Sequence, residues 1–468
     1  MLFSSAIFLF FFLPLVLLSY YFTPKKYKNL LLLIVSLSFY TFGEKELVLL
    51  IITSTIIDFF AGKIIEKGYK KQGLFLSIFA NLSFLIYFKY ATFAFENYYI
   101  FLELIGNNSI NWQNIPHIIL PLGISFYTFQ TMSYTIDVYR GNVKANHNFI
   151  NFATYVTLFP QLIAGPIVRY KDIHKQLTDR KQNSKQFSQG VERFIIGLAK
   201  KMIIANNLAY VADSIIAIPN SNLHSMAAWV GIIAYSLQIY FDFSGYSDMA
   251  IGLGKMFGFE FLENFNYPYI SKSIRDFWRR WHISLSTWFR DYLYISLGGN
   301  RKGNSRTYIN LIIVFFITGL WHGASWNFIV WGLFHGFFLI IERLGFAKIL
   351  DKIPKFIAHI YTLLVVIIAW VFFRLDTITD AVNYIKLMFS FNNNSNSDFL
   401  SYYITKEVIM AFLLATLFSF PIYKVVTNKL QNNNYYLVIK TILLLLLFVI
   451  STMYIAVDSY NPFIYFRF

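Results

Sequence analysis

The residue best placed for chemistry is His322, one of eight histidines in the chain. It lies between Trp321 and Gly323, in a short turn ending at Trp326 that joins two long apolar runs. An ionisable side chain at membrane depth is costly, and is therefore a functional hypothesis by default. Burial disfavours the charged imidazolium, and a neutral imidazole is what a general base requires. The alternative is a histidine that only links two helices by hydrogen bonds, and position alone does not decide between them.

A second histidine, His282, lies in the amphipathic segment 271–297, where apolar residues recur at helical spacing. Trp278 and Ser286 are each four residues away, so all three side chains are expected on one side of a helix. This helix is expected to lie in an interface or to dip into the protein rather than to cross the membrane. The functional interpretation is a polar helix that lines a cavity reached from the cytosol. The alternative is an interfacial helix with an aromatic belt.

Basic residues surround His282, and they suggest what that cavity would bind. A guanidinium pairs with a phosphate through two hydrogen bonds, so a donor that carries phosphates would suit this segment. The candidate donor-binding residues are Arg279, Arg280 and Arg290, with Lys200 and Lys201 as further candidates.

Two carboxylates interrupt the apolar stretch 226–251. They are Asp242 and Asp248, and Tyr246 lies between them. Ionisable residues in such a run commonly line a cavity or a pathway, so we expect Asp242 and Tyr246 to line a tunnel. A transporter whose polar groups relay protons or bind a solute, with Asp242, Asp248, His282 and His322 as those groups, is an alternative that stays open.

Other catalytic patterns are absent from the sequence. The chain has no cysteine, no HExxH motif and no GxSxG motif, so we expect no thiol nucleophile and no metal site. Gly252 and Gly254 lie in an apolar run with no strand before them, and we interpret them as helix-packing glycines rather than a nucleotide-binding loop. His335, inside an apolar run, is equally well explained by packing or by support of a catalytic group.

The composition is that of a membrane protein with many crossings. Hydrophobic residues make up 57% of the 468 residues and charged residues 14%, whereas an average soluble domain is about a quarter charged. Apolar runs of roughly 17 to 25 residues recur along the whole length, which is enough to cross a bilayer as helices. We expect a single membrane-embedded domain over residues 1–468. The net charge of +16 is scattered over short loops, which argues against nucleic-acid binding.

The positive-inside rule gives a topology. The basic loops 25–28 and 63–71 are expected in the cytosol, whereas loop 95–117, which has no Lys or Arg, is expected outside. The weakly basic loop 393–398 is also expected outside. Both chain ends, Met1 and Phe468, are then expected on the outer, extracytoplasmic side of the membrane, with roughly ten or more crossings.

Several segments, in this order, resemble the bacterial envelope branch of the membrane-bound O-acyltransferase (MBOAT) superfamily. With the flanking apolar runs they cover nearly the whole chain. The matching segments are Pro121–Gly141, Phe159–Arg169, Gly197–Asn206, Tyr240–Phe259, Asn264–Asn300 and Gly319–Gly336, the last of which reads GLWHGASWNFIVWGLFHG.

The resemblance implies a fold and assigns roles. It implies an all-α polytopic protein, a ring of roughly ten to twelve transmembrane helices with re-entrant and in-plane amphipathic helices around a central catalytic tunnel. His322 corresponds to the catalytic histidine of the family, and His282 corresponds to its second functional histidine. Trp321 and Trp326, which flank His322, would line the tunnel. In the same branch an aromatic C-terminal tail, here residues 461–468, is proposed to hold the acyl group, which makes Tyr465 the acceptor. The alternative for the tail is an interfacial anchor.

The expected function is therefore transfer of an acetyl group from a cytosolic thioester across a bacterial cytoplasmic (inner) membrane. The donor would be acetyl-CoA, used as a substrate rather than a resident cofactor. The resemblance also implies an extracytoplasmic SGNH-type O-acetyltransferase as partner, in addition to membrane lipid. Peptidoglycan is the first choice of polymer, and alginate or another exopolysaccharide is the second. A proton-coupled transporter and a passive membrane scaffold remain the alternatives of other classes.

Overall fold

The computed structural model describes residues 2–106, 115, 118–220, 222–390, 402–430, 435–457, 460–462 and 464. Within these residues the chain forms helices and connecting loops and contains no strand, which confirms the expected all-α class. Its α-helices are α1 Leu13–Phe22, α2 Lys28–Glu44, α3 Val48–Glu66, α4 Lys70–Leu85, α5 Ala91–Leu104, α6 Ile124–Tyr139, α7 Phe149–Thr157, α8 Phe159–Leu162, α9 Tyr170–Thr178, α10 Ser184–Ala199, α11 Asn206–Ile216, α12 Ser225–Met256, α13 Ile274–Arg280, α14 Ile283–Trp288, α15 Gly303–His322, α16 Trp326–Ile341, α17 Ala347–Lys352, α18 Lys355–Arg374, α19 Ile378–Met388, α21 Lys406–Phe418, α22 Ile422–Leu430 and α23 Tyr436–Ala456.

Many of these helices are long and apolar enough to cross a membrane. In the described residues there are 7 such helical stretches, or up to 8 if α21 and α22, bent by 68° at their junction, form one span. The chain is therefore a multi-pass membrane protein. The expected number of ten to twelve transmembrane helices stays a prediction. The apolar helix Phe8–Phe22 is shorter than the roughly 20 residues needed for a full span.

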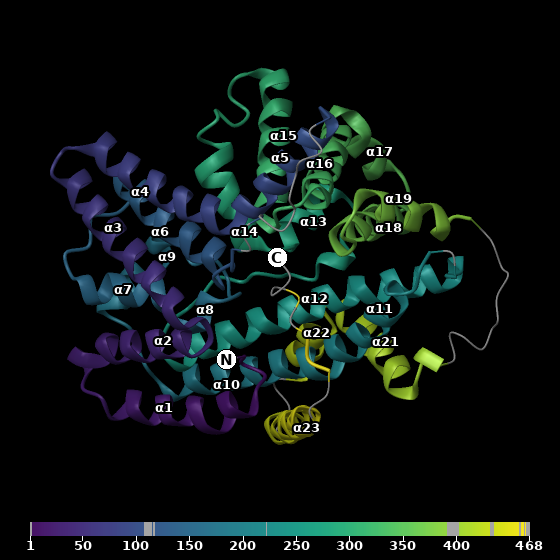
Figure 1. The fold of residues 1–468 in the computed structure, drawn as a ribbon. Helices are drawn as coiled ribbons and strands as arrows, with labels where there is room; N and C mark the ends of the chain where they lie inside the picture. The colour runs from purple at the N-terminus through teal and green to yellow at the C-terminus, as the bar shows by residue number, and fades with distance from the viewer. Residues whose placement is uncertain are drawn as a thin grey trace.

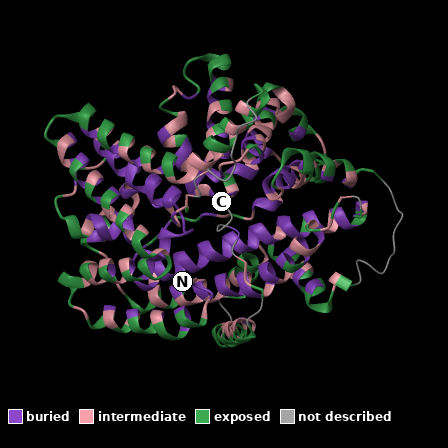
Figure 2. Ribbon diagram, viewed as in Figure 1, coloured by how far each residue is buried: buried purple, intermediate pink, exposed green. Residues whose placement is uncertain are grey.

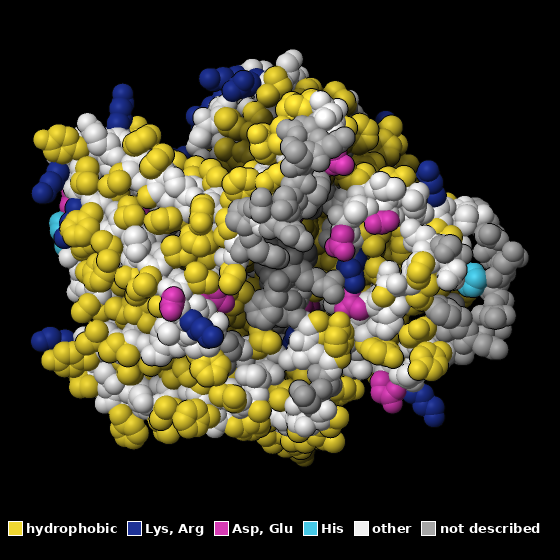
Figure 3. Space-filling model, viewed as in Figure 1, with side chains coloured by type: hydrophobic (Ala, Val, Ile, Leu, Met, Phe, Trp, Pro, Cys, Tyr) yellow, Lys and Arg dark blue, Asp and Glu magenta, His cyan; other side chains and the backbone are white. Residues whose placement is uncertain are grey.

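Hydrophobic side chains are spread over much of the face seen in Figure 3, as expected for helices that contact lipid. The buried residues are concentrated on the inner helices, above all on α12 (Figure 2). In Figure 1, α12 runs across the middle of the molecule, with the group α13 to α19 above it in this view. At the edge lies α23, in whose apolar window only 6% of the residues are buried.

Glycines allow α10 to pack closely against α12. A Cβ atom on Gly197 would lie 2.6 Å from the carbonyl oxygen of Gly245. One on Gly252 would lie 2.6 Å from the carbonyl oxygen of Gly190, so both ends of the crossing exclude larger side chains. Small residues at such positions let two helix backbones approach each other within a membrane. The interpretation of Gly252 as a packing glycine is thereby confirmed.

The hairpin of α15 and α16 is built in the same way, and it positions His322. A Cβ atom on Gly319 would overlap the carbonyl oxygen of Phe328, and one on Gly332 would overlap that of Phe315. The two helices therefore pack backbone to backbone, and the turn between them leaves His322 as the last residue of α15. The two apolar runs inferred on either side of this turn are confirmed.

The segment around His282 differs from its expectation. It is not one amphipathic helix, because α13 ends at Arg280 and α14 begins at Ile283. His282 lies between them in the left-handed region, with a φ of 45°. The expectation that Trp278, His282 and Ser286 share one face of a continuous helix is therefore wrong. Such a backbone conformation is uncommon for a residue with a side chain, and it turns the imidazole toward the interior.

Candidate functional site

The imidazole of His322 lies in an aromatic enclosure. Its ring centroid is 4.9 Å from that of Trp331, 5.0 Å from that of Trp321 and 5.2 Å from that of Phe373. The side chain is buried, and within the described part of the chain neither of its ring nitrogens has a hydrogen-bond partner. A buried polar atom without a partner costs about 1–3 kcal/mol. A substrate hydroxyl that completes this hydrogen bond would account for the arrangement.

His282 is held by an amide instead. Its Nδ1 lies 3.1 Å from Oδ1 of Asn264. The same oxygen accepts hydrogen bonds from the backbone N–H and the hydroxyl of Ser284, and Nδ2 of Asn264 donates to Ser247, so the amide orientation is fixed. Because an amide oxygen only accepts, the proton of His282 lies on Nδ1. Its Nε2 is left as an acceptor, and it has no partner among the described residues.

The structure brings the two histidines together. Their ring centroids are 6.5 Å apart, and the ring of Trp321 lies 5.9 Å from that of His282. The indole N–H of Trp321 donates to the carbonyl of Ser125 on α6, at 3.4 Å. Three separate parts of the chain, around 125, 282 and 322, thus converge on one place. This convergence supports the pairing of His322 with His282 inferred from the sequence.

Lys89 also belongs to this region, although the sequence analysis did not identify it. Its Nζ donates to the carbonyl oxygens of Trp321, at 2.6 Å, and of His322, at 3.2 Å. The last carbonyls of a helix lack partners within the helix, and a cation there is favourable. The sequence feature that could have identified Lys89 is its position within a long apolar helix, the one that continues into α5, because a charge is unusual there.

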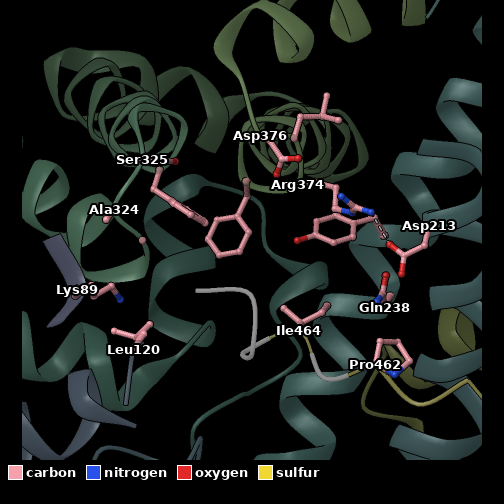
Figure 4. Close-up of a pocket in the computed structure, with 15 residues that line it drawn as sticks. Lys89, Leu120, Asp213, Gln238, Ala324, Ser325, Arg374, Asp376, Pro462 and Ile464 are labelled. Atoms are coloured by element: carbon pink, nitrogen blue, oxygen red, sulfur yellow. Dashed lines mark hydrogen bonds and ion pairs between the residues drawn. The ribbon is translucent and has the colours of Figure 1, made fainter. Parts of the chain in front are cut away.

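A cavity of about 330 Å³ lies directly beside the end of α15. Figure 4 shows Lys89 and Leu120 on one side of it, Asp213 and Arg374 on the other, and Ile464 between them. The described residues that line it are Lys89, Leu120, Asp213, Tyr235, Gln238, Gly323, Ala324, Ser325, Phe328, Phe373, Arg374, Leu375, Asp376, Pro462 and Ile464. The cavity is thus bordered both by the residue after His322 and by the C-terminal segment.

The residues expected to bind the donor lie elsewhere. Arg279 and Arg290 are exposed, and Arg290 pairs with Asp291 at 2.8 Å. Arg280 forms an ion pair with Asp276 at 3.0 Å. None of the three borders the cavity. The hydroxyl of Ser286 donates to a carbonyl of its own segment, that of Trp281. That these arginines bind the donor therefore stays a prediction, and it concerns a part of the molecule that does not border the cavity.

Trp278, Tyr246 and Trp326, which were also expected at the site, lie outside the cavity lining. Trp278 packs against the rings of Trp331 and His335, one layer behind His322. Tyr246 stacks on Phe3 with 4.6 Å between ring centroids. Trp326 is half exposed, and its indole N–H donates to Asn97.

Asp242 pairs with Lys201 at 2.7 Å, whereas Lys200 pairs with Asp248. Tyr465 lies outside the described residues.

Comparison with known proteins assigns the chain to a family. Residues 142–379 match the sequence model of the membrane-bound O-acyltransferase family. A protein named probable alginate O-acetylase AlgI, from Azotobacter vinelandii, is 46% identical over 89% of this chain and 83% of its own length. The Pseudomonas putida protein of that name is 42% identical over the full length of both chains. The peptidoglycan O-acetyltransferase of Helicobacter pylori is 38% identical over 84% of this chain and 81% of its own. The resemblance noted in the sequence is confirmed, and this chain belongs to the membrane-bound O-acyltransferase family of enzymes.

Proposed function

We propose that this acyltransferase moves an acetyl group from cytosolic acetyl-CoA through a bacterial inner membrane to an acceptor on the outside. The observation that carries the proposal is the imidazole of His322, which has no hydrogen-bond partner among the described residues and lies next to a cavity lined in part by Pro462 and Ile464. Membership in a family of acyltransferases removes the support for a transporter or a passive scaffold.

His322 acts as the general base of the transfer. One of its ring nitrogens takes the proton of the accepting hydroxyl while the oxygen attacks the thioester carbonyl. The carbon–sulfur bond then breaks, and the thiolate that leaves takes the proton back from the imidazolium. His282 is 6.5 Å away between ring centroids, and its Nε2 is free of other partners in the described structure, so it orients the reacting groups.

Tyr465 is the first acceptor in this proposal. It directly follows Ile464, which is buried and borders the cavity. An extracytoplasmic O-acetyltransferase of the SGNH type then takes the acetyl group from Tyr465 and transfers it to an envelope polysaccharide. The names of the relatives support alginate and peptidoglycan equally as that polymer.

Replacing His322 by glutamine tests the base. Glutamine is similar in size and can hydrogen-bond, but it cannot take up a proton at neutral pH. General-base catalysis contributes about 100- to 10,000-fold, so polymer acetylation should be lost in cells that contain normal amounts of the protein. His335→Gln is the matched control, because His335 is also buried and also without a hydrogen-bond partner among the described residues, but neither it nor its neighbours in the chain line the cavity. Near-normal acetylation with His322→Gln would exclude this residue as the base.

The acceptor is tested by Tyr465→Phe. This change keeps the aromatic ring and removes only the oxygen that carries the acetyl group. If Tyr465 is an acetyl acceptor, the variant is inactive; if the tail is only an interfacial anchor, the variant stays active. We expect acetylation to fall as far as with His322→Gln. Mass spectrometry of the C-terminal peptide from cells without the partner should show the mass of one added acetyl group. Full activity of Tyr465→Phe would leave the tail as an anchor.

A further inference from the structure

The described residues of the C-terminal segment, 460–462 and 464, are held by hydrogen bonds to other parts of the protein. Main-chain atoms of Pro462 and Ile464 bind a buried ion pair between Lys201 and Asp242. Lys201 donates from Nζ to the carbonyl oxygen of Pro462. Asp242 accepts, at 3.0 Å, from the backbone N–H of Ile464.

The ion pair itself is almost entirely buried. Lys201 and Asp242 are 2.7 Å apart, and their side chains are 3% and 2% exposed. Removing two charges from water is expensive unless further hydrogen bonds satisfy them. Here the polarity is matched, because the ammonium binds a carbonyl and the carboxylate binds an N–H. The segment thus supplies hydrogen bonds that this ion pair requires.

Neighbouring contacts hold the same segment on either side of the ion pair. The side chain of Asn206 donates to that of Asn461 at 3.2 Å. The hydroxyl of Tyr460 donates to Asp213 at 2.6 Å, and Asp213 is paired with Arg374, also at 2.6 Å. Asp213 and Arg374 line the cavity together with Pro462 and Ile464 (Figure 4). The segment is therefore fixed at the wall of the cavity beside His322.

We propose that Lys201 and Asp242 form a clamp that binds main-chain atoms of Pro462 and Ile464 and fixes the C-terminal segment at the wall of the cavity. The inference rests on the proposed function in one respect, that the clamped segment carries the acceptor. Lys201 and Asp242 are positioning residues, since they act on the chain that bears the acceptor and not on the acetyl group. Hydrogen bonds to backbone atoms set the register of the segment irrespective of its side chains.

The clamp can be removed without leaving a lone buried charge. The double variant Lys201→Met/Asp242→Leu replaces the ion pair by apolar side chains of similar size, a change that is often neutral for stability. The matched control is Lys200→Met/Asp248→Leu. Lys200 and Asp248 form an ion pair at 2.7 Å between the same two parts of the chain. Arg193, the other partner of Asp248, retains its ion pair with Glu263 in this control variant.

Release of the segment is measured with a single cysteine, because the native chain has none. Ile464→Cys, at a position only 5% exposed, is labelled with a maleimide in the purified full-length protein. We expect the clamp-free variant to react about tenfold faster or more, the scale expected for losing hydrogen bonds to charged groups. The control variant should react at the original rate. An unchanged rate in the clamp-free variant would overturn the clamp.

A second pair of variants leaves the ion pair intact. Ile464→Pro removes the backbone N–H that donates a hydrogen bond to Asp242, whereas Ile464→Val keeps this N–H. With an Asn461→Cys reporter, labelling should be faster in the proline variant than in the valine variant, and equal rates would contradict main-chain recognition. Acetylation is scored separately. If labelling rises but acetylation is unchanged, the clamp stands and the acceptor role of the tail is wrong.

Discussion

At the scale of single residues, position relative to the cavity distinguishes three buried histidines, because the ring nitrogens of His335, like those of His322, have no hydrogen-bond partner among the described residues. His282 has one nitrogen fixed by Asn264, and His335 is surrounded by the rings of Phe277, Trp278 and Trp331. Only His322 is followed directly by a residue of the cavity wall. The capacity of each to handle a proton therefore depends on its neighbours, since the three side chains are chemically identical. Which nitrogen of a histidine is basic is set by the hydrogen bond that the other one makes.

Asn264 is predicted to control His282 through that hydrogen bond. Asn264→Leu removes the acceptor for Nδ1–H, so the ring can turn or change tautomer. Positioning losses of this kind, as documented for partners of metal-bound histidines, reach about 10- to 100-fold, and we expect acetylation to fall on that scale. Ser247→Ala is the control, because it removes a hydrogen bond of Asn264 without touching the oxygen that holds His282. Equal acetylation rates for Asn264→Leu and Ser247→Ala would contradict the role of the amide.

The sequence predicted His322 and His282 as candidates because an ionisable residue near tryptophans can be recognised without knowledge of the fold. Lys89 was missed, since its role depends on the carbonyls of Trp321 and His322, more than 200 positions further along the chain. The partner of Asp242 was missed for the same reason. A carboxylate in an apolar run must have a hydrogen-bonding or charged partner. The sequence does not show whether that partner is a substrate, a lysine or the C-terminal tail. Such pairings are products of tertiary structure.

At the scale of helices, irregular turns orient the important side chains. Lys89 lies in the π-helical turn Ile86–Tyr90, and Lys201 lies in the π-helical turn Lys200–Ala205. The extra residue in such a turn shifts the direction of the side chains, and π-helical turns are frequent at functional sites. Helical periodicity assumes a regular helix, so it predicted neither turn. It also predicted one helix over 271–297, where the chain breaks at His282.

The closeness of α15 and α16 yields a prediction at this scale. In Gly332→Ala the new methyl group meets the carbonyl of Phe315 and the backbone of Gly319, which cannot move separately from α15. We expect a loss of about 1–3 kcal/mol, as for overpacked cores, together with reduced acetylation because His322 is displaced. Gly336→Ala, one turn further on α16, meets only the side chain of Phe315, with 3.1 Å to its Cβ, and should be milder. Thermal unfolding of both variants in detergent distinguishes them, and equal stability would contradict the close-packed hairpin.

At the scale of the whole molecule, the cavity and the arginines of segment 271–297 do not share a wall. The cavity is bordered by the C-terminal segment, whereas Arg279 and Arg290 are exposed at other positions. An enzyme that takes its donor from one side of a membrane and delivers to the other needs two separate openings. The arrangement agrees with this requirement if the arginines face the cytosol and the tail enters from outside. The positive-inside rule gives the same orientation from the loops alone.

Labelling from one side of the membrane tests this orientation. Arg279→Cys and Arg290→Cys, in a chain without native cysteine, should resist an impermeant maleimide in intact cells and react once the membrane is opened. Lys67→Cys, in a basic loop, should behave in the same way. Leu104→Cys, 80% exposed at the end of α5, should react from outside in intact cells. Arginine positions that react like Leu104→Cys would place segment 271–297 outside, where no acetyl-CoA is present, and would exclude it as the donor site. If they follow Lys67→Cys, charge reversal at both arginines should raise the KM for acetyl-CoA, because the phosphates lose their guanidinium partners.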